Sequence, residues 1–125
     1  MADVRSNRDL VAWQKSMALA TACDRETATF PASEIYGMTS QIRRAGASVP
    51  ANIADGYGRE TTRAYVRALR VAPGSLKELD THVLLAQTVE SMGDDSTGRP
   101  LDRCEEVGRM LRALIRALQK RSSAE

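Results

Sequence analysis

Apolar residues recur along this 125-residue chain at the spacings of three and four that are typical of amphipathic helices. The clearest run begins at Tyr65 and continues over about three heptads. It consists of Tyr65, Leu69, Ala72, Leu76, Leu79, Val83 and Ala86. The pattern as a whole predicts four helices, over residues 9–28, 33–57, 61–92 and 100–120.

Helix-breaking residues separate these four segments. Pro31 ends the first helix, because the residue before a proline is pushed out of helical geometry. Gly56 and Gly58 end the second, and residues 93–100 form a loop rich in breakers. Short connections favour antiparallel neighbours, so we expect one all-α domain over residues 1–125, an antiparallel up-down-up-down four-helix bundle.

Two prolines fall inside the expected helices. Pro50 and Pro73 each remove a backbone hydrogen bond and clash with the preceding turn, which costs about 3 kcal/mol or produces a kink. One interpretation is that the second and third helices bow apart there and open space. The simpler interpretation, which we favour, is a tolerated kink with nothing bound.

A stripe of polar residues adjoins the apolar face of the second helix. Its members follow one another at steps of 3, 4, 4 and 3: Gln41, Arg44, Ser48, Asn52 and Asp55. The third helix offers Ser75, Glu78 and His82 at similar steps. We expect these side chains to form a structural polar network that fixes register or subunit geometry. The alternative is a ligand or catalytic site, but no nucleophile, base and orienting group occur at a recognisable spacing.

Basic residues concentrate in the middle of the chain. Residues 41–77 hold seven basic and two acidic side chains, although the net charge of the whole chain is only +2. Arg59, Arg63, Arg67 and Arg70 follow helical spacing and suit sequence-independent contacts with phosphate. The alternative is an ordinary solvated helix face. The last helix carries a second row, Arg109, Arg112, Arg116 and Lys120, which Glu105 and Glu106 partly offset.

Composition excludes several other classes of protein. No apolar run approaches the ~20 residues needed to span a bilayer, and the N-terminus lacks the apolar segment of a signal peptide. We therefore expect a cytoplasmic protein that does not bind membranes. Cys23 and Cys104 are expected to be structural thiols, and with a single histidine we expect no metal site and no cofactor. We also expect no enzymatic activity.

The second and third helices carry more apolar residues than one buried stripe needs. Val66, Val71, Leu84 and Leu85 add to the main run of the third helix. These extra positions predict either self-association through a second buried face or a wider core within one chain.

Several separated motifs resemble one bacterial family. They are Asp9-Leu10 with Trp13-Gln14-Lys15, Phe30-Pro31, Glu34-Ile-Tyr-Gly-Met38, Gln41-Ile-Arg-Arg-Ala45, Ser48-Val-Pro-Ala-Asn-Ile-Ala-Asp-Gly56 and Gly74-Ser75-Leu76-Lys-Glu78-Leu79. Together they resemble the four-helix-bundle proteins named for the intervening sequences of 23S ribosomal RNA genes, over roughly residues 8–93. A more distant likeness in fold is to the accessory protein of diversity-generating retroelements, which works with a reverse transcriptase and binds nucleic acid.

The resemblance implies a four-helix bundle that assembles into a ring-like homopentamer, without established enzymatic activity. The positions that match the family motifs are Gln41, Arg43, Arg44, Ser48, Asn52, Gly56, Ser75 and Glu78. Asp55 stands where the family commonly has glutamate, and Pro73 stands where proline is not usual. The shorter carboxylate puts one contact in doubt, and the proline puts the straightness of the third helix in doubt.

These observations combine into one functional hypothesis. We expect a non-catalytic homo-oligomer, a pentamer by resemblance, that binds RNA or DNA or a nucleic-acid-processing protein. The residues expected to contact phosphate are Arg43, Arg44, Arg59, Arg63 and Arg67. The residues expected in the structural network are Gln41, Ser48, Asn52, Asp55, Ser75 and Glu78. The alternatives are a protein-binding scaffold without nucleic acid, and a small-molecule site at the polar stripe lined by Arg44, Asn52 and Glu78.

Overall fold

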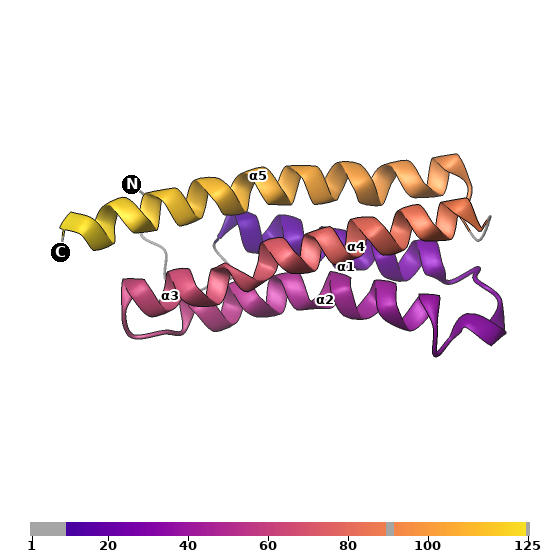
Figure 1. Ribbon diagram of the computed structural model, residues 1–125, viewed down its shortest axis with the longest axis horizontal. Coiled ribbons are helices and arrows are strands. Elements are labelled where there is room, and N and C mark those ends of the chain that lie inside the picture. The colour runs from indigo at the N-terminus through magenta and orange to yellow at the C-terminus, as the bar shows by residue number, and fades with distance from the viewer. Residues whose placement is uncertain (1–9, 90–91, 125) are drawn as a thin grey trace.

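Four antiparallel helical rods form the fold (Figure 1). The computed structural model describes residues 10–89 and 92–124, without the side chains of residues 94–97 and 122–124. Its elements are α1 (Val11–Thr27), the short 3-10 helix η2 (Ala32–Glu34), α2 (Met38–Tyr57), α3 (Thr62–Leu69), α4 (Val71–Thr88) and α5 (Asp94–Ala124). No strand occurs among the described residues. The all-helical bundle is therefore confirmed.

The third rod is made of two helices, where the sequence pattern predicts one over residues 61–92. The Thr61 hydroxyl accepts a hydrogen bond from the Ala64 amide at 3.1 Å and caps the start of α3. Pro73 has no amide hydrogen to donate to the Leu69 carbonyl, and α3 ends at Leu69. Pro73 then lies in the first turn of α4, where a helix needs no such donor. The predicted interior proline is thus the start of a new helix.

The second helix also begins later than its expected start near residue 33. A 3-10 turn and a bend precede it, and Ile35, expected on the apolar face, is 55% exposed. The Met38 amide donates to the Glu34 carboxylate at 3.2 Å, so the side chain of Glu34 satisfies the first amide of α2. Ser33, the candidate cap at the expected start, lies in the 3-10 turn instead. At its other end, α2 continues through Pro50 to Tyr57.

The last helix begins at Asp94, inside the stretch expected to be a loop. Pro100 is fully buried within α5, so packing against the bundle outweighs the local preference of Gly98 and Pro100 for a break. The reversal between α4 and α5 is correspondingly tight, because the amide of Met92 donates to the Ala86 carbonyl at 3.2 Å. The helix extends to Ala124, beyond the predicted end at 120.

The core lies along the common axis of the four rods. It includes the expected apolar run of α4 and the run of α5, and Leu69, Leu79 and Leu111 are fully buried. Neighbouring rods follow chain order, with α1 against α2, α2 against α4, and α5 against both α4 and α1. Besides this square of rods, α3 packs against α5. That last contact places the second half of α5 beside α3.

Candidate nucleic-acid interface

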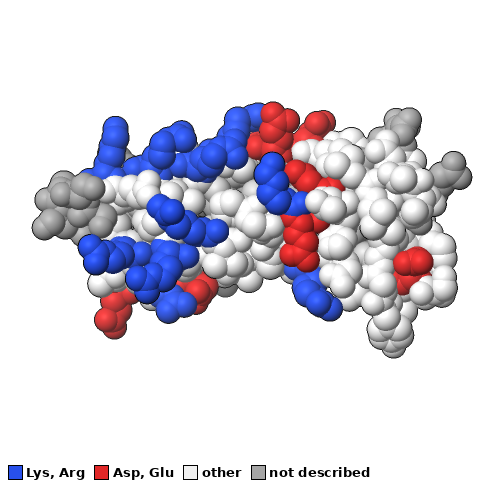
Figure 2. All heavy atoms as spheres, viewed as in Figure 1, with Lys and Arg blue, Asp and Glu red and all other residues white. Residues whose placement is uncertain are grey.

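Two rows of basic side chains lie together at one end of the bundle. The first comes from α3 and its flanks, and the second from the C-terminal half of α5, which α3 contacts. We call this surface the basic end; its members are Arg59, Arg63, Arg67, Arg70, Arg109, Arg112, Arg116, Lys120 and Arg121. Figure 2 shows Lys and Arg gathered on the left half of the face in view, a band of Asp and Glu near the middle, and a largely uncharged surface to the right of that band.

The buried faces of α3 and α5 explain why both basic rows face solvent. In α3, Val66 and Leu69 are buried against the bundle, so Arg63 and Arg67 point to solvent. In α5, Val107, Leu111 and Leu118 are buried, and the basic residues between them occupy the outer face. Amphipathicity alone therefore turns both rows outward.

Most cations of the basic end have no carboxylate partner. All nine side chains are exposed. Arg59 pairs with Asp55 at 2.8 Å and Arg109 pairs with Glu105 at 3.0 Å. The other seven form no ion pair with a described residue, and Glu60 is the one acidic residue within 59–70 and 109–121. Exposed ion pairs contribute little to stability, so phosphate could replace even the two that exist.

The five arginines expected to contact phosphate fall into two groups. Arg59, Arg63 and Arg67 belong to the basic end. Arg43 and Arg44 lie near the start of α2, at the opposite end of the bundle. Arg43 donates from Nε to the Thr27 hydroxyl at 2.9 Å and from a terminal nitrogen to the Asp24 carbonyl at 3.3 Å, and therefore joins α2 to α1.

The α5 half of the basic end was visible in the sequence as a row but was not assigned to the site. Arg109, Arg112, Arg116 and Lys120 are about fifty residues away from the α3 row. Only the packing of α3 on α5 joins the two rows. The spacing of residues along a single helix does not show which other helix lies beside it.

The polar stripe of α2 makes local contacts in the single chain. The Ser48 hydroxyl donates to the Ala45 carbonyl at 2.9 Å, and the Asn52 amide donates to the Ser48 carbonyl at 2.7 Å. Across on α4, Glu78 faces His82 at 3.6 Å. Among the described residues, no side-chain hydrogen bond joins Gln41, Ser48, Asn52 or Asp55 to Ser75 or Glu78. A network linking the two helices is absent from the single chain, and a role of the stripe in assembly stays a prediction.

Two buried thiols lie inside the bundle, as the sequence predicts. Burial, with a smaller effect of the Asp24 and Glu26 carboxylates, raises the pKa of the Cys23 thiol from 9.0 to about 12. Burial also raises the pKa of Cys104, whose thiol donates a hydrogen bond to the Asp80 carboxylate. Both are free cysteines and stay protonated at neutral pH. They act as small apolar side chains of the core.

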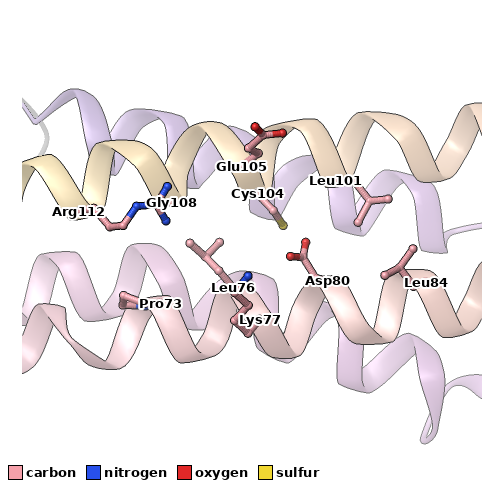
Figure 3. Close-up of a pocket in the computed structure, with 10 residues that line it drawn as sticks. All are labelled: Pro73, Leu76, Lys77, Asp80, Leu84, Leu101, Cys104, Glu105, Gly108 and Arg112. Carbon is pink, nitrogen blue, oxygen red and sulfur yellow. The ribbon is translucent and has the colours of Figure 1, made fainter.

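A groove of about 380 Å³ runs between α4 and α5 (Figure 3). The expected small-molecule site was to be lined by Arg44, Asn52 and Glu78, but none of these lines the groove, which lies on the α5 side of α4. The described His, Cys, Asp and Glu side chains form no group of three that could hold a metal ion. Of the helices that the structure describes, none combines the length and apolar character needed to cross a membrane.

Comparison with known proteins identifies relatives of this bundle. The family model of the 23S rRNA-intervening sequence protein matches residues 8–113. A crystal structure of a protein of unknown function from the S23 ribosomal protein family of Bacteroides thetaiotaomicron is similar in fold, with a TM-score of 0.75 and 19% sequence identity. That alignment covers 84% of this chain and 98% of the other. No curated protein matches the chain.

Proposed function

Because this chain belongs to the 23S rRNA-intervening sequence protein family, we propose that it is a non-catalytic homo-oligomer that binds RNA or DNA through its basic end. The observation that carries the proposal is the segregation of charge. Nine exposed cations from two distant segments share one end of a chain whose net charge is only +2. Rows of guanidinium groups suit phosphate, to which they donate paired hydrogen bonds.

The proposed mode of binding is contact with the phosphate backbone. Lys and Arg that neutralise phosphates release condensed counterions, so affinity falls steeply as salt rises. The rows come from helix faces that carry no exposed aromatic side chain between the arginines, which argues against a stacking platform for single strands. The proposed binding is therefore independent of sequence along most of the contact.

A matched pair of double variants tests the basic end. Arg63→Ala with Arg67→Ala removes two of its cations. Arg25→Ala with Arg99→Ala removes two exposed arginines that lie toward the other end of the bundle. We expect the first pair to weaken RNA binding at least about tenfold and to lower the slope of log affinity against log salt by about two. The control pair should change the affinity much less. Equal losses, or no detectable binding by the wild type at low salt, would contradict the proposal.

Self-association is the second part of the proposal, and the pentamer is its specific form. Four large apolar residues between the start of α4 and the residue that follows it are 47% to 54% exposed: Val71, Leu84, Leu85 and Val89. Apolar surface of this kind often marks a contact between proteins. A ring would also multiply the basic end by the number of subunits. Light scattering, with absorbance at 260 and 280 nm on the same peak, measures both the mass and any nucleic acid bound; a monomer would contradict the ring.

The absence of catalysis is part of the same proposal. His82 is the one histidine of the chain, and its nearest carboxylate, Glu78, lies one helical turn away on the same helix. Among the described residues, neither Ser48 nor Ser75 forms a hydrogen bond with His82. A protein of this kind would act in the cytoplasm beside its nucleic acid.

A second candidate function is a protein-binding scaffold, on which a nucleic-acid-processing protein docks at α4. Leu85 and Val89 favour it, because they are about half exposed, do not line the groove beside the basic end, and lie toward the end of α4 that is farther from Arg70. The discriminating result is nucleic-acid affinity: a scaffold alone would show none at low salt, and Leu85→Glu would abolish partner capture without changing the charge of the basic end.

A further inference from the structure

The groove between α4 and α5 opens beside the basic end. Arg112 belongs to both surfaces, since it lines the groove and is also part of the α5 row. The walls come from helices that run antiparallel, so their residues meet in a fixed order (Figure 3). Going away from the basic end, Arg112 and Pro73 come first, and Leu101 and Leu84 come last.

Charge changes sign along this groove. Arg112 places one cation at the end that adjoins the basic rows, and Lys77 places a second one about one helical turn beyond Pro73. Glu105 lies level with Lys77, Asp80 places a carboxylate three residues beyond Lys77, and the apolar Leu101 and Leu84 follow. An occupant that matches this order carries an anionic group first and hydrogen-bond donors next, on a body that tolerates apolar walls.

Three of the four charged groups lack a partner of opposite sign. Glu105 is held by Arg109 at 3.0 Å. Asp80, Lys77 and Arg112 form no ion pair with any described residue. Asp80 is only partly exposed, and its carboxylate accepts one hydrogen bond, from the buried Cys104 thiol. A carboxylate has room for several donors, so Asp80 can accept more from an occupant of the groove.

We propose that this groove takes one unpaired nucleotide of a strand bound at the basic end, and that it favours a base with an exocyclic amino group. The inference rests on the proposed binding of nucleic acid. The phosphate of that nucleotide would lie near Arg112 and Lys77. The base would lie between Leu76 and Leu101, with its amino group donating to Asp80.

The chemistry of the bases gives the selectivity. Cytosine, adenine and guanine each carry an amino group that donates to a carboxylate, and acidic side chains are known to accept from cytosine in this way. Uracil and thymine carry carbonyl oxygens at the corresponding positions and would face the negative charge of Asp80. A base inside a duplex is held in the stack between its neighbours and cannot enter the groove, so a fully paired helix gains nothing from it.

Three RNA hairpins with the same stem test this inference. One carries a single bulged cytidine, one a bulged uridine, and one no bulge. We expect fluorescence anisotropy to give at least about fivefold tighter binding of the cytidine bulge than of the other two. Asp80→Ala should remove this preference. Asp102→Ala is the control, because Asp102 is an exposed carboxylate of α5 that does not line the groove. Like Asp80→Ala, it removes one negative charge and should strengthen the attraction of phosphate in general, but it should keep the preference for cytidine.

The outcomes separate the groove from the basic end. Equal affinity of the wild type for all three hairpins would overturn the groove proposal, whether or not Asp80→Ala folds. In that case, loss of binding in the Arg63→Ala, Arg67→Ala protein would still support the basic end. A preference for cytidine that survives in a folded Asp80→Ala protein would also overturn the assignment. No binding of any hairpin at low salt would defeat both proposals together.

Discussion

Gly56 lies directly against the ring of Tyr65. A Cβ atom at position 56 would lie 2.9 Å from Cδ1 of Tyr65 and 3.3 Å from its backbone oxygen. The Tyr65 ring also meets Tyr57 edge to face, with ring centroids 6.2 Å apart. This close approach joins the end of α2 to α3, and so fixes where the first row of the basic end projects.

Replacing Gly56 by alanine is therefore expected to destabilise the protein. An added methyl group must displace both the ring and the backbone of Tyr65, and overpacking of this kind costs about 1–3 kcal/mol. That cost exceeds the gain of about 0.5–1 kcal/mol from replacing a helical glycine. Urea unfolding of the Gly56→Ala protein measures the difference. Gly74→Ala is the control, since a Cβ at Gly74 meets nothing within 4 Å and should raise the stability.

Arg43→Ala is expected to lower stability with little effect on nucleic-acid affinity. The substitution removes the hydrogen bonds from Arg43 to the Thr27 hydroxyl and the Asp24 carbonyl, which join α2 to α1. We expect a loss of about 0.5–1.5 kcal/mol in the free energy of unfolding. Arg44→Ala, which breaks no hydrogen bond or ion pair with a described residue, should change the free energy of unfolding by less. A large loss of RNA affinity at unchanged stability would restore Arg43 to the phosphate-binding set.

The sequence predicts the buried face of the third rod, α3 and α4, well because its apolar residues are periodic. Leu69, Leu76, Leu79 and Val83 repeat at steps that only a helix can place on one face, and all four are buried. The helix ends were harder to predict. Ser33 has the local signal of a cap but lies exposed in a 3-10 turn ahead of α2. Pro100 has the local signal of a break, yet it is fully buried inside α5.

The candidate site was only half predictable for a different reason. Helical spacing identified Arg63 and Arg67 as one exposed row and Arg112 and Arg116 as another. Whether two rows share a surface depends on which helices touch, and both parts of the third rod, α3 and α4, pack against α5. The two rows share a surface because α3 packs against α5, a contact that the spacing of residues along either helix does not show.

The buried thiols predict a loss of stability in alkaline solution. Burial in the folded protein raises the pKa of the Cys23 thiol from 9.0 to about 12. As the pH rises, the unfolded chain therefore loses this proton before the folded protein does. The contribution of the neutral thiol is complete below pH 9 and is lost as the pH rises from there toward 12. In that range the free energy of unfolding falls by up to about 1.4 kcal/mol per pH unit for each such thiol. Cys23→Ala should flatten the curve of unfolding free energy between pH 9 and 11, and parallel curves would contradict the assignment.

Asn52→Leu is expected to alter assembly more than binding. Asn52 is half-buried on the polar stripe of α2, and its amide donates only to the Ser48 carbonyl one turn back, so the rest of its polar surface is available to another subunit. A leucine cannot satisfy polar groups facing it across an interface, and buried asparagines often fix the number and register of subunits. We expect light scattering to show a changed mass or a mixture of species. Ala47→Leu adds the same side chain at an exposed position of α2 and should leave the mass unchanged. Because Asn52 lies outside the basic end, RNA affinity per subunit should change little; an intact assembly that no longer binds RNA would instead place Asn52 in the binding site.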